Sequence, residues 1–293
     1  MSEPADDTTR PTLDALLPAA MARRAEAVGA AKVAMPALRM FTLAVLGGAF
    51  IGLGAMFSTV ATANTGVPFG VNRFLGGVTF SLGLVLVIVG GAELFTGNNL
   101  IVMAWASRRV STKRLLRNWV IVYAGNFVGA VSLAVLVFFT GQHRSGGGAV
   151  GRRVIDIGVA KTDLRIGNAV AAGVLANVLV CLAVWLCFSA RSVTDKIVAI
   201  VLPVSAFVAA GFEHSIANMY FVPEALLVKR RTSAEFLTTI GIPRDELGHL
   251  TWARFFTHNL VPVTIGNVIG GAVMVGLVYW FVYRPPSAVT PGD

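Results

Sequence analysis

The segments GAELFTGNN (residues 91–99) and GFEHSIANM (residues 211–219) are two copies of one pattern, in which Gly-x-Glu is followed by an asparagine five residues after the glutamate. The two glutamates, Glu93 and Glu213, are 120 residues apart, and both lie in long apolar runs. A repeat of polar groups in apolar surroundings indicates a fold built from two related halves.

Composition identifies these surroundings as a lipid bilayer. Of 293 residues, 55% are hydrophobic and 13% are charged, and the mean hydropathy is +0.73, whereas soluble domains carry about 25% charged residues. A helix that crosses the hydrocarbon needs about 20 mostly apolar residues. Six runs meet this requirement, at about residues 40–64, 74–104, 118–140, 167–189, 196–228 and 257–283. The sequence therefore predicts an all-α membrane protein with six transmembrane helices in one domain.

A second internal match relates the two halves. YAGNFVGA (residues 123–130) in the third run and TIGNVIGG (residues 264–271) in the sixth share Gly-Asn-x-x-Gly at a shift of 141. The first three runs thus correspond to the last three. Because three is an odd number of crossings, the second half must enter the membrane from the opposite face, which gives the inverted repeat found in many transport proteins.

The two runs that contain the glutamates are too long for one perpendicular helix each. They hold about 31 and 33 residues, where about 20 suffice. Each is predicted to be two half-helices, and residues 96–99, Thr-Gly-Asn-Asn, are poor helix-interior residues suited to such a break. Irregular backbone at this depth is tolerated where it is buried in protein or lines a wet cavity. The breaks therefore indicate a permeation path.

Ionisable side chains in the membrane are costly, and they are functional hypotheses by default. Here they include Glu93, Glu213 and His214. The glutamates also have a structural interpretation, since they could accept hydrogen bonds from backbone N–H groups freed by the breaks. His214 has no repeat mate, because Leu94 stands at the matching position, and this favours a functional role.

The chain divides into residues 1–38, a charged N-terminal segment, residues 39–284, the transmembrane domain, and residues 285–293, a tail. Two alternative interpretations fit the N-terminal segment. It forms either an amphipathic helix on the membrane surface that starts near Thr12, or a partly disordered tail. Basic residues favour cytoplasmic N- and C-termini, since five precede the first span and only Arg73 directly follows it. The five are Arg10, Arg23, Arg24, Lys32 and Arg39.

Other function classes are disfavoured. The net charge of +9 does not indicate a nucleic-acid partner, because no basic helix with interleaved aromatics is present. Cys181 and Cys187 have neither disulfide nor metal spacing, and no metal or cofactor is expected. An intramembrane hydrolase using His214 and Ser215 is a remote alternative, since adjacent helical residues do not face each other and no hydrolase motif occurs. No enzyme activity is expected.

Five segments resemble the formate/nitrite transporter family, and its bacterial formate channels in particular: GAELFT, LANVLVCLAVW, SARSVTDK, LPVSAFVAAGFEHSIANMYFVP and NLVPVTIGNVIGG. The resemblance runs from about residue 38 to residue 283. It implies an aquaporin-like six-helix protomer, assembled as a homopentamer in the bacterial inner membrane, with a pore through each protomer. Aquaporins themselves are disfavoured, because the chain contains no Asn-Pro-Ala.

The family's motifs assign roles to particular positions. Its pore histidine falls on His214, the preceding glutamate on Glu213, the threonine of the broken second helix on Thr96, and the lysine before the fourth helix on Lys161. The other assignments are the hydrogen-bonding asparagines Asn177 and Asn267, the constrictions Phe80 and Phe207 on one side of the histidine, and the constrictions Leu84 and Phe95 on the other. Residues 142–160 match no motif of the family.

The resemblance implies a path for a small monovalent anion, most nearly formate, with nitrite and hydrosulfide as alternatives and protons as a second partner. Lys161 and backbone N–H groups near Thr96 would attract the anion, and a bare anion is costly to desolvate between apolar constrictions. His214 would offset that cost by donating a hydrogen bond, or by donating a proton so that a neutral acid passes. An unperturbed pKa of about 6.5 suits histidine to such a switch.

Overall fold

The computed structural model describes residues 15–243 and 247–284. Within them, six helical stretches are long and apolar enough to cross a membrane, as the sequence predicts: α2 (Ala37–Ala61), α3 (Phe69–Gly90), α5 (Thr112–Phe139), α7 (Ile166–Ser189), α8 (Val193–Ala210) and the stretch Trp252–Tyr283. This last stretch consists of α11 (Trp252–Arg254), η4 (Phe255–Leu260), α12 (Val261–Val268), η5 (Ile269–Leu277) and α13 (Val278–Tyr283), in which both η segments are π-helical.

The second and fifth apolar runs are broken, as predicted. α3 ends at Gly91 (φ +83°) and α8 ends at Gly211 (φ +79°), both in the left-handed region that glycine enters without a steric penalty. The chain resumes as η1 (Gly97–Ile101) and α4 (Val102–Ala106) in the first half, and as α9 (Ser215–Arg231) in the second. The first break thus starts at Gly91, upstream of the residues from which it was predicted.

Glycines allow the spans of each half to approach closely. A Cβ added to Gly129 on α5 would lie 1.9 Å from the carbonyl oxygen of Val45 on α2. In the second half, a Cβ on Gly270 would lie 2.1 Å from the carbonyl oxygen of Val174 on α7. These are the glycines of the repeated Gly-Asn-x-x-Gly, and they permit the backbone contact that such motifs provide in membranes.

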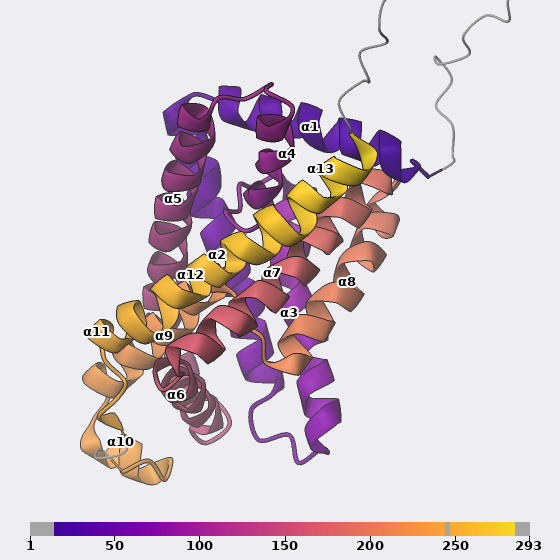
Figure 1. Ribbon diagram of the computed structural model, residues 1–293. Helices are drawn as coiled ribbons and strands as arrows, with labels where there is room; N and C mark the ends of the chain where they lie inside the picture. The colour runs from indigo at the N-terminus through magenta and orange to yellow at the C-terminus, as the bar shows by residue number, and fades with distance from the viewer. Residues whose placement is uncertain (1–14, 244–246, 285–293) are drawn as a thin grey trace, which may run out of the picture.

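A surface helix precedes the three spans of each half. α1 (Pro18–Ala34) lies across one end of the bundle, beside α4 and α13, whereas α6 (Ala149–Thr162) lies toward the other end, with α10 (Ala234–Thr239) and the short turn η2 (Gln142–Arg144) (Figure 1). The repeat is therefore one helix longer than the sequence indicated, and residues 142–160, which matched no motif, contain most of that helix.

The N-terminal segment is helical from Pro18, six residues later than the expected start near Thr12. α1 buries Met21, Ala25 and Val33, and its Glu26 accepts a hydrogen bond from Arg284 Nε at 3.0 Å. The helix thus packs on the protein as well as lying at its end. The parts of the expected N-terminal segment and tail at residues 1–14 and 285–293 lie outside the described residues.

Candidate functional site

A buried asparagine holds the first helix break. Asn126 Nδ2 donates to the carbonyl oxygens of Ala44 at 2.7 Å and Glu93 at 2.9 Å, and Asn126 Oδ1 accepts from the backbone N–H of Phe95 at 2.9 Å. These bonds satisfy backbone groups that the break removes from the helical pattern, as burial requires.

A second asparagine repeats this arrangement at the other break. Asn267 Nδ2 donates to the carbonyl oxygens of Gly173 at 2.8 Å and Glu213 at 3.0 Å, and Asn267 Oδ1 accepts from the backbone N–H of Ser215 at 2.9 Å. The two halves are therefore related in hydrogen bonding as well as in sequence. The amide of Asn267 makes three bonds with the protein, and the predicted site residue acts in this structure by fixing the break.

The two breaks meet at Thr96 and His214. Thr96 Oγ1 lies 2.9 Å from His214 Nε2, although the residues are 118 positions apart. Thr96 is fully buried and His214 is 3% exposed. The structure thus brings together the hydroxyl and the imidazole that the family motifs singled out.

The position of His214 fixes its neutral tautomer. His214 is the N-cap of α9, and its Nδ1 accepts the backbone N–H of Ala217 at 3.1 Å. A neutral imidazole with Nδ1 as acceptor carries its hydrogen on Nε2, so Nε2–H donates to Thr96 Oγ1. The hydroxyl hydrogen of Thr96 is then available to a third group.

Aromatic rings cover one side of His214. The ring of Phe207 stacks on the imidazole with centroids 6.0 Å apart, and Phe80 meets Phe207 edge-on at 5.7 Å. Phe221 in turn stacks on Phe80 at 6.4 Å, and the ammonium of Lys161 lies 5.4 Å from the Phe221 centroid. The predicted constriction residues Phe80 and Phe207 therefore stand between His214 and the end of the molecule that carries α6.

A cavity of about 320 Å³ opens on this side, and we call it the α6-side vestibule. Lys161 and Glu213 line it, and Lys161 Nζ lies 3.0 Å from both carboxylate oxygens of Glu213. Glu213 also accepts from Asn218 Nδ2 at 2.7 Å, and Asn218 Nδ2 donates to Asn259 Oδ1 at 2.7 Å. Lys161 is therefore ion-paired.

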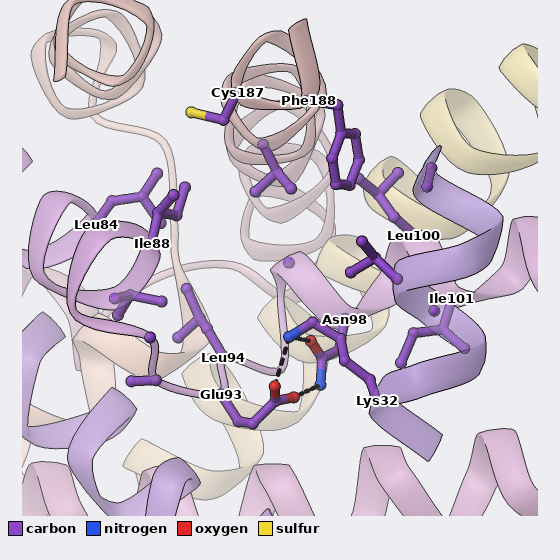
Figure 2. A pocket seen from close by; sticks show the side chains of 18 of the residues that line it. Lys32, Leu84, Ile88, Glu93, Leu94, Asn98, Leu100, Ile101, Cys187 and Phe188 are labelled. Carbon is purple, nitrogen blue, oxygen red and sulfur yellow. Dashed lines mark hydrogen bonds and ion pairs between the residues drawn. The ribbon is translucent and has the colours of Figure 1, made fainter. Parts of the chain in front are cut away.

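An equivalent cluster of one lysine, one glutamate and two asparagines lies on the α1 side of the molecule. A second cavity, of about 280 Å³, is the α1-side vestibule, and Figure 2 shows Lys32 and Asn98 converging on the Glu93 carboxylate. Lys32 Nζ is 2.6 Å from Glu93 Oε1, Asn98 Nδ2 is 2.7 Å from Glu93 Oε2, and Asn98 Nδ2 donates to Asn118 Oδ1 at 3.0 Å. The glutamates thus bind lysine and asparagine side chains, and the expectation that they accept freed backbone N–H groups is wrong.

Three predicted site residues lie elsewhere around the centre. Leu84 lines the α1-side vestibule together with Leu94. Asn177 Nδ2 donates to the carbonyl oxygen of Asn267 at 2.6 Å and that of Thr96 at 3.3 Å, so it ties the two breaks together.

Phe95, expected beside Leu84, instead packs edge-on against aromatic rings of α5, at 4.9 Å and 6.1 Å, and lines a separate groove. Its backbone is held by α5, which turns its ring away from the vestibule.

Motif matching did not identify five residues of the two clusters: Lys32, Asn98, Asn118, Asn218 and Asn259. The repeat contains the signals that find most of them. Asn98 and Asn218 are related by the shift of 120, and Asn118 and Asn259 by the shift of 141. Lys32 precedes the first span as Lys161 precedes the fourth. This correspondence identifies Lys32 as the counterpart of Lys161 only once α1 and α6 are known to be equivalent.

Both cysteines are buried thiols. Cys181 Sγ lies 3.4 Å from the carbonyl oxygen of Thr96, and Cys187 lines the α1-side vestibule.

Comparison with known proteins identifies the family. The family model for formate/nitrite transporters matches residues 19–281, which includes both breaks, both lysines and His214. The chain belongs to the formate/nitrite transporter family. It is 46% identical to the formate channel FocA of Escherichia coli (strain K12) over 271 residues, covering 92% of this chain and 95% of that protein. It is also 37% identical to FocA of Haemophilus influenzae, covering 81% and 84%.

Solved structures of the formate/nitrite transporter family have the same fold. A pentameric formate channel with formate bound superposes with a TM-score of 0.80 at 44% identity, covering 84% of this chain and 97% of that chain. An FNT family ion channel gives a TM-score of 0.76 at 28% identity, covering 90% and 98%. The protein is thus a multi-pass membrane channel or transporter for anions and not an enzyme, and the hydrolase alternative is excluded.

Proposed function

We propose that this protein is a channel for formate and similar small monovalent anions, assembled as a homopentamer with one pore through each protomer. The observation that carries the proposal is the contact between Thr96 and His214, which lies between two vestibules that each contain a basic residue. The family relatives named as formate channels support formate as the substrate.

The proposed path runs from the α6-side vestibule past His214 to the α1-side vestibule. Lys161 attracts the anion electrostatically, and its pairing with Glu213 holds the ammonium at the cavity wall. Phe80 and Phe207 form the constriction on this side, and Leu84 with Leu94 forms the one on the other. Asn177 and Asn267 act by fixing the breaks, since their amides are engaged with the protein.

His214 and Thr96 supply the hydrogen bond that replaces lost hydration. With Nε2–H donated to Thr96 Oγ1, the threonine hydroxyl donates its own hydrogen to the anion in the constriction. This offsets part of the cost of moving an anion into apolar surroundings. Proton donation to the anion requires the imidazolium form, in which Nδ1 also carries a hydrogen and can no longer cap α9. Proton-linked transport therefore involves a rearrangement of the first turn of α9.

The protein is further proposed to lie in a bacterial inner membrane with residues 1–38 and 285–293 in the cytoplasm. The helix α1 and the end of α13 lie at the same end of the bundle (Figure 1), which is consistent with both termini on one side. The basic residues before the first span favour the cytoplasm for that side.

Nitrite and hydrosulfide are the alternative substrates within the family. Uptake of labelled formate, nitrite and hydrosulfide into proteoliposomes, measured side by side with the purified protein, tests the choice. Formate uptake that exceeds the other two at equal concentration supports the proposal. Uptake of nitrite or hydrosulfide without formate would exclude it.

A further inference from the structure

The α6-side vestibule contains more positive charge than its carboxylates compensate. Besides Lys161, which pairs with Glu213, its wall includes Arg73 from α3 and Arg153 from α6. Among residues 15–243 and 247–284, neither guanidinium has a carboxylate within ion-pair distance, whereas Lys161 does. Two arginines therefore face one cavity without a protein counter-ion.

Neutral groups hold both arginines in place. Arg73 Nε donates to the carbonyl oxygen of Ala209 at 2.9 Å, and Arg73 Nη2 donates to that of Val208 at 2.9 Å. These carbonyls belong to the C-terminal turn of α8, directly before the break that leads to His214. Arg153 Nε donates to Thr62 Oγ1 at 3.1 Å. Each guanidinium is thereby oriented by neutral groups, without an ion pair to a carboxylate among the described residues.

The remaining carboxylate on this wall is Asp156, which pairs with the Nε of Arg152 at 3.1 Å on the same helix. Burial, and next the positive charge of Arg73, lower the pKa of Arg153 from its usual value, and Asp156 offsets only part of this effect. Arginine nevertheless stays charged in proteins, so the two cations repel each other across the cavity unless an anion lies between them.

Arg153 also stands at the entrance. Arg153 and Asp156 line an adjoining and more open cavity together with Arg152 and the glycine loop at residues 146–148. Arg153 thus lies on the wall that the two cavities share, whereas Lys161 lines only the α6-side vestibule.

We propose that Arg73 and Arg153 bind a small planar oxyanion, a carboxylate such as formate, at the mouth of the α6-side vestibule. The guanidinium fork donates hydrogen bonds to the two oxygens of one carboxylate, an arrangement that a spherical ion cannot offer. The site concentrates the substrate ahead of Lys161 and favours oxyanions over hydrosulfide. This inference rests on the proposed function for the identity of the anion.

Formate uptake by proteoliposomes containing the Arg153→Gln variant tests the site, with Arg144→Gln as the matched control. Arg144 is an exposed arginine of η2 that does not line the vestibule. Arg153→Gln is expected to raise the half-saturating formate concentration about fivefold, the effect of one partly exposed charged hydrogen bond, with maximal uptake unchanged. Arg144→Gln is expected to match the wild type. Arg153→Lys, which retains the charge but lacks the guanidinium fork, is expected to restore only part of the affinity.

A second measurement does not depend on transport. Phenylglyoxal modifies guanidinium groups, and mass spectrometry of the detergent-purified protein locates the modified residues. Formate, compared with chloride at equal ionic strength, is expected to protect Arg153 and leave Arg144 unprotected. Equal modification of Arg153 in formate and chloride, with an unchanged half-saturating concentration in Arg153→Gln, would overturn the site while leaving the proposed function intact. Protection of Arg153 in a protein that takes up no formate supports the site and contradicts the proposed function.

Discussion

Lys161 Nζ lies 3.0 Å from both carboxylate oxygens of Glu213, the residue directly before the central histidine. The pair is largely buried, with side-chain exposures of 14% and 9%. The lysine therefore has two roles, since it attracts the anion and neutralises a carboxylate inside the protein.

Replacing Lys161 by Met is expected to destabilise the protein, because it leaves Glu213 charged and buried. Breaking a buried pair in this way costs about 3 kcal/mol, which is measurable as a lower melting temperature in detergent. The double variant Lys161→Met/Glu213→Gln removes both charges and is expected to recover most of the stability, but not uptake at low formate concentration. A double variant as unstable as the single one would contradict this account.

Asn126 and Asn267 are expected to contribute similarly to stability. Asn126→Ala and Asn267→Ala each remove three hydrogen bonds to buried backbone groups, at about 3 kcal/mol or more in total. Both variants should lower the melting temperature by comparable amounts, whereas Asn72→Ala, at the first turn of α3, should not. If either alanine variant kept the wild-type melting temperature, other contacts would hold that break.

Shortening Phe207 is expected to relax size selectivity. Phe207→Ala removes the ring that stacks on His214 and meets Phe80, so acetate and lactate should gain uptake relative to formate. Phe139→Ala, which truncates a ring that is 78% exposed on the outside of α5, serves as the control. An unchanged acetate-to-formate ratio in Phe207→Ala would place the selective constriction elsewhere.

His214→Asn separates hydrogen bonding from protonation. Asparagine is a strong N-cap and can accept the N–H of Ala217 as His214 does, while its amide still donates toward Thr96. The variant should therefore assemble normally, yet formate uptake should lose any pH dependence that protonation of this imidazole confers. Uptake at a series of pH values, with elution volume as the assembly check, decides the matter. A wild-type pH profile in the assembled variant would rule out proton linkage through this residue.

Much of the fold follows from the sequence because its signals are local or repeated. Apolar run length predicts the spans, and the matching Gly-x-Glu and Gly-Asn-x-x-Gly segments predict two inverted halves. The contact of Thr96 with His214 has no local signal, since it joins positions in different halves. The family motifs singled out both residues but not their contact.

Other features depend on three-dimensional packing. The pairing of Lys161 with Glu213 requires the position of α6, a helix too polar to be recognised by hydropathy. The contacts of Phe95 also depend on packing, and its assignment to a constriction rests on the family motifs alone. Its backbone N–H is held by Asn126, and its ring faces α5.

The position of α1 and α6 has a consequence for how the polypeptide can be divided. Each half is a complete unit, with its own surface helix, its own lysine and its own asparagine brace, and the loop between them is exposed at Gly146 and Gly147. Gly146 and Gly147 line neither the α6-side nor the α1-side vestibule, so a cut between them removes no wall residue of either vestibule. Two fragments, residues 1–146 and 147–293, should therefore reassociate when co-expressed and reconstitute anion uptake by complementation. Each alone lacks half of the contact between Thr96 and His214, and neither should conduct.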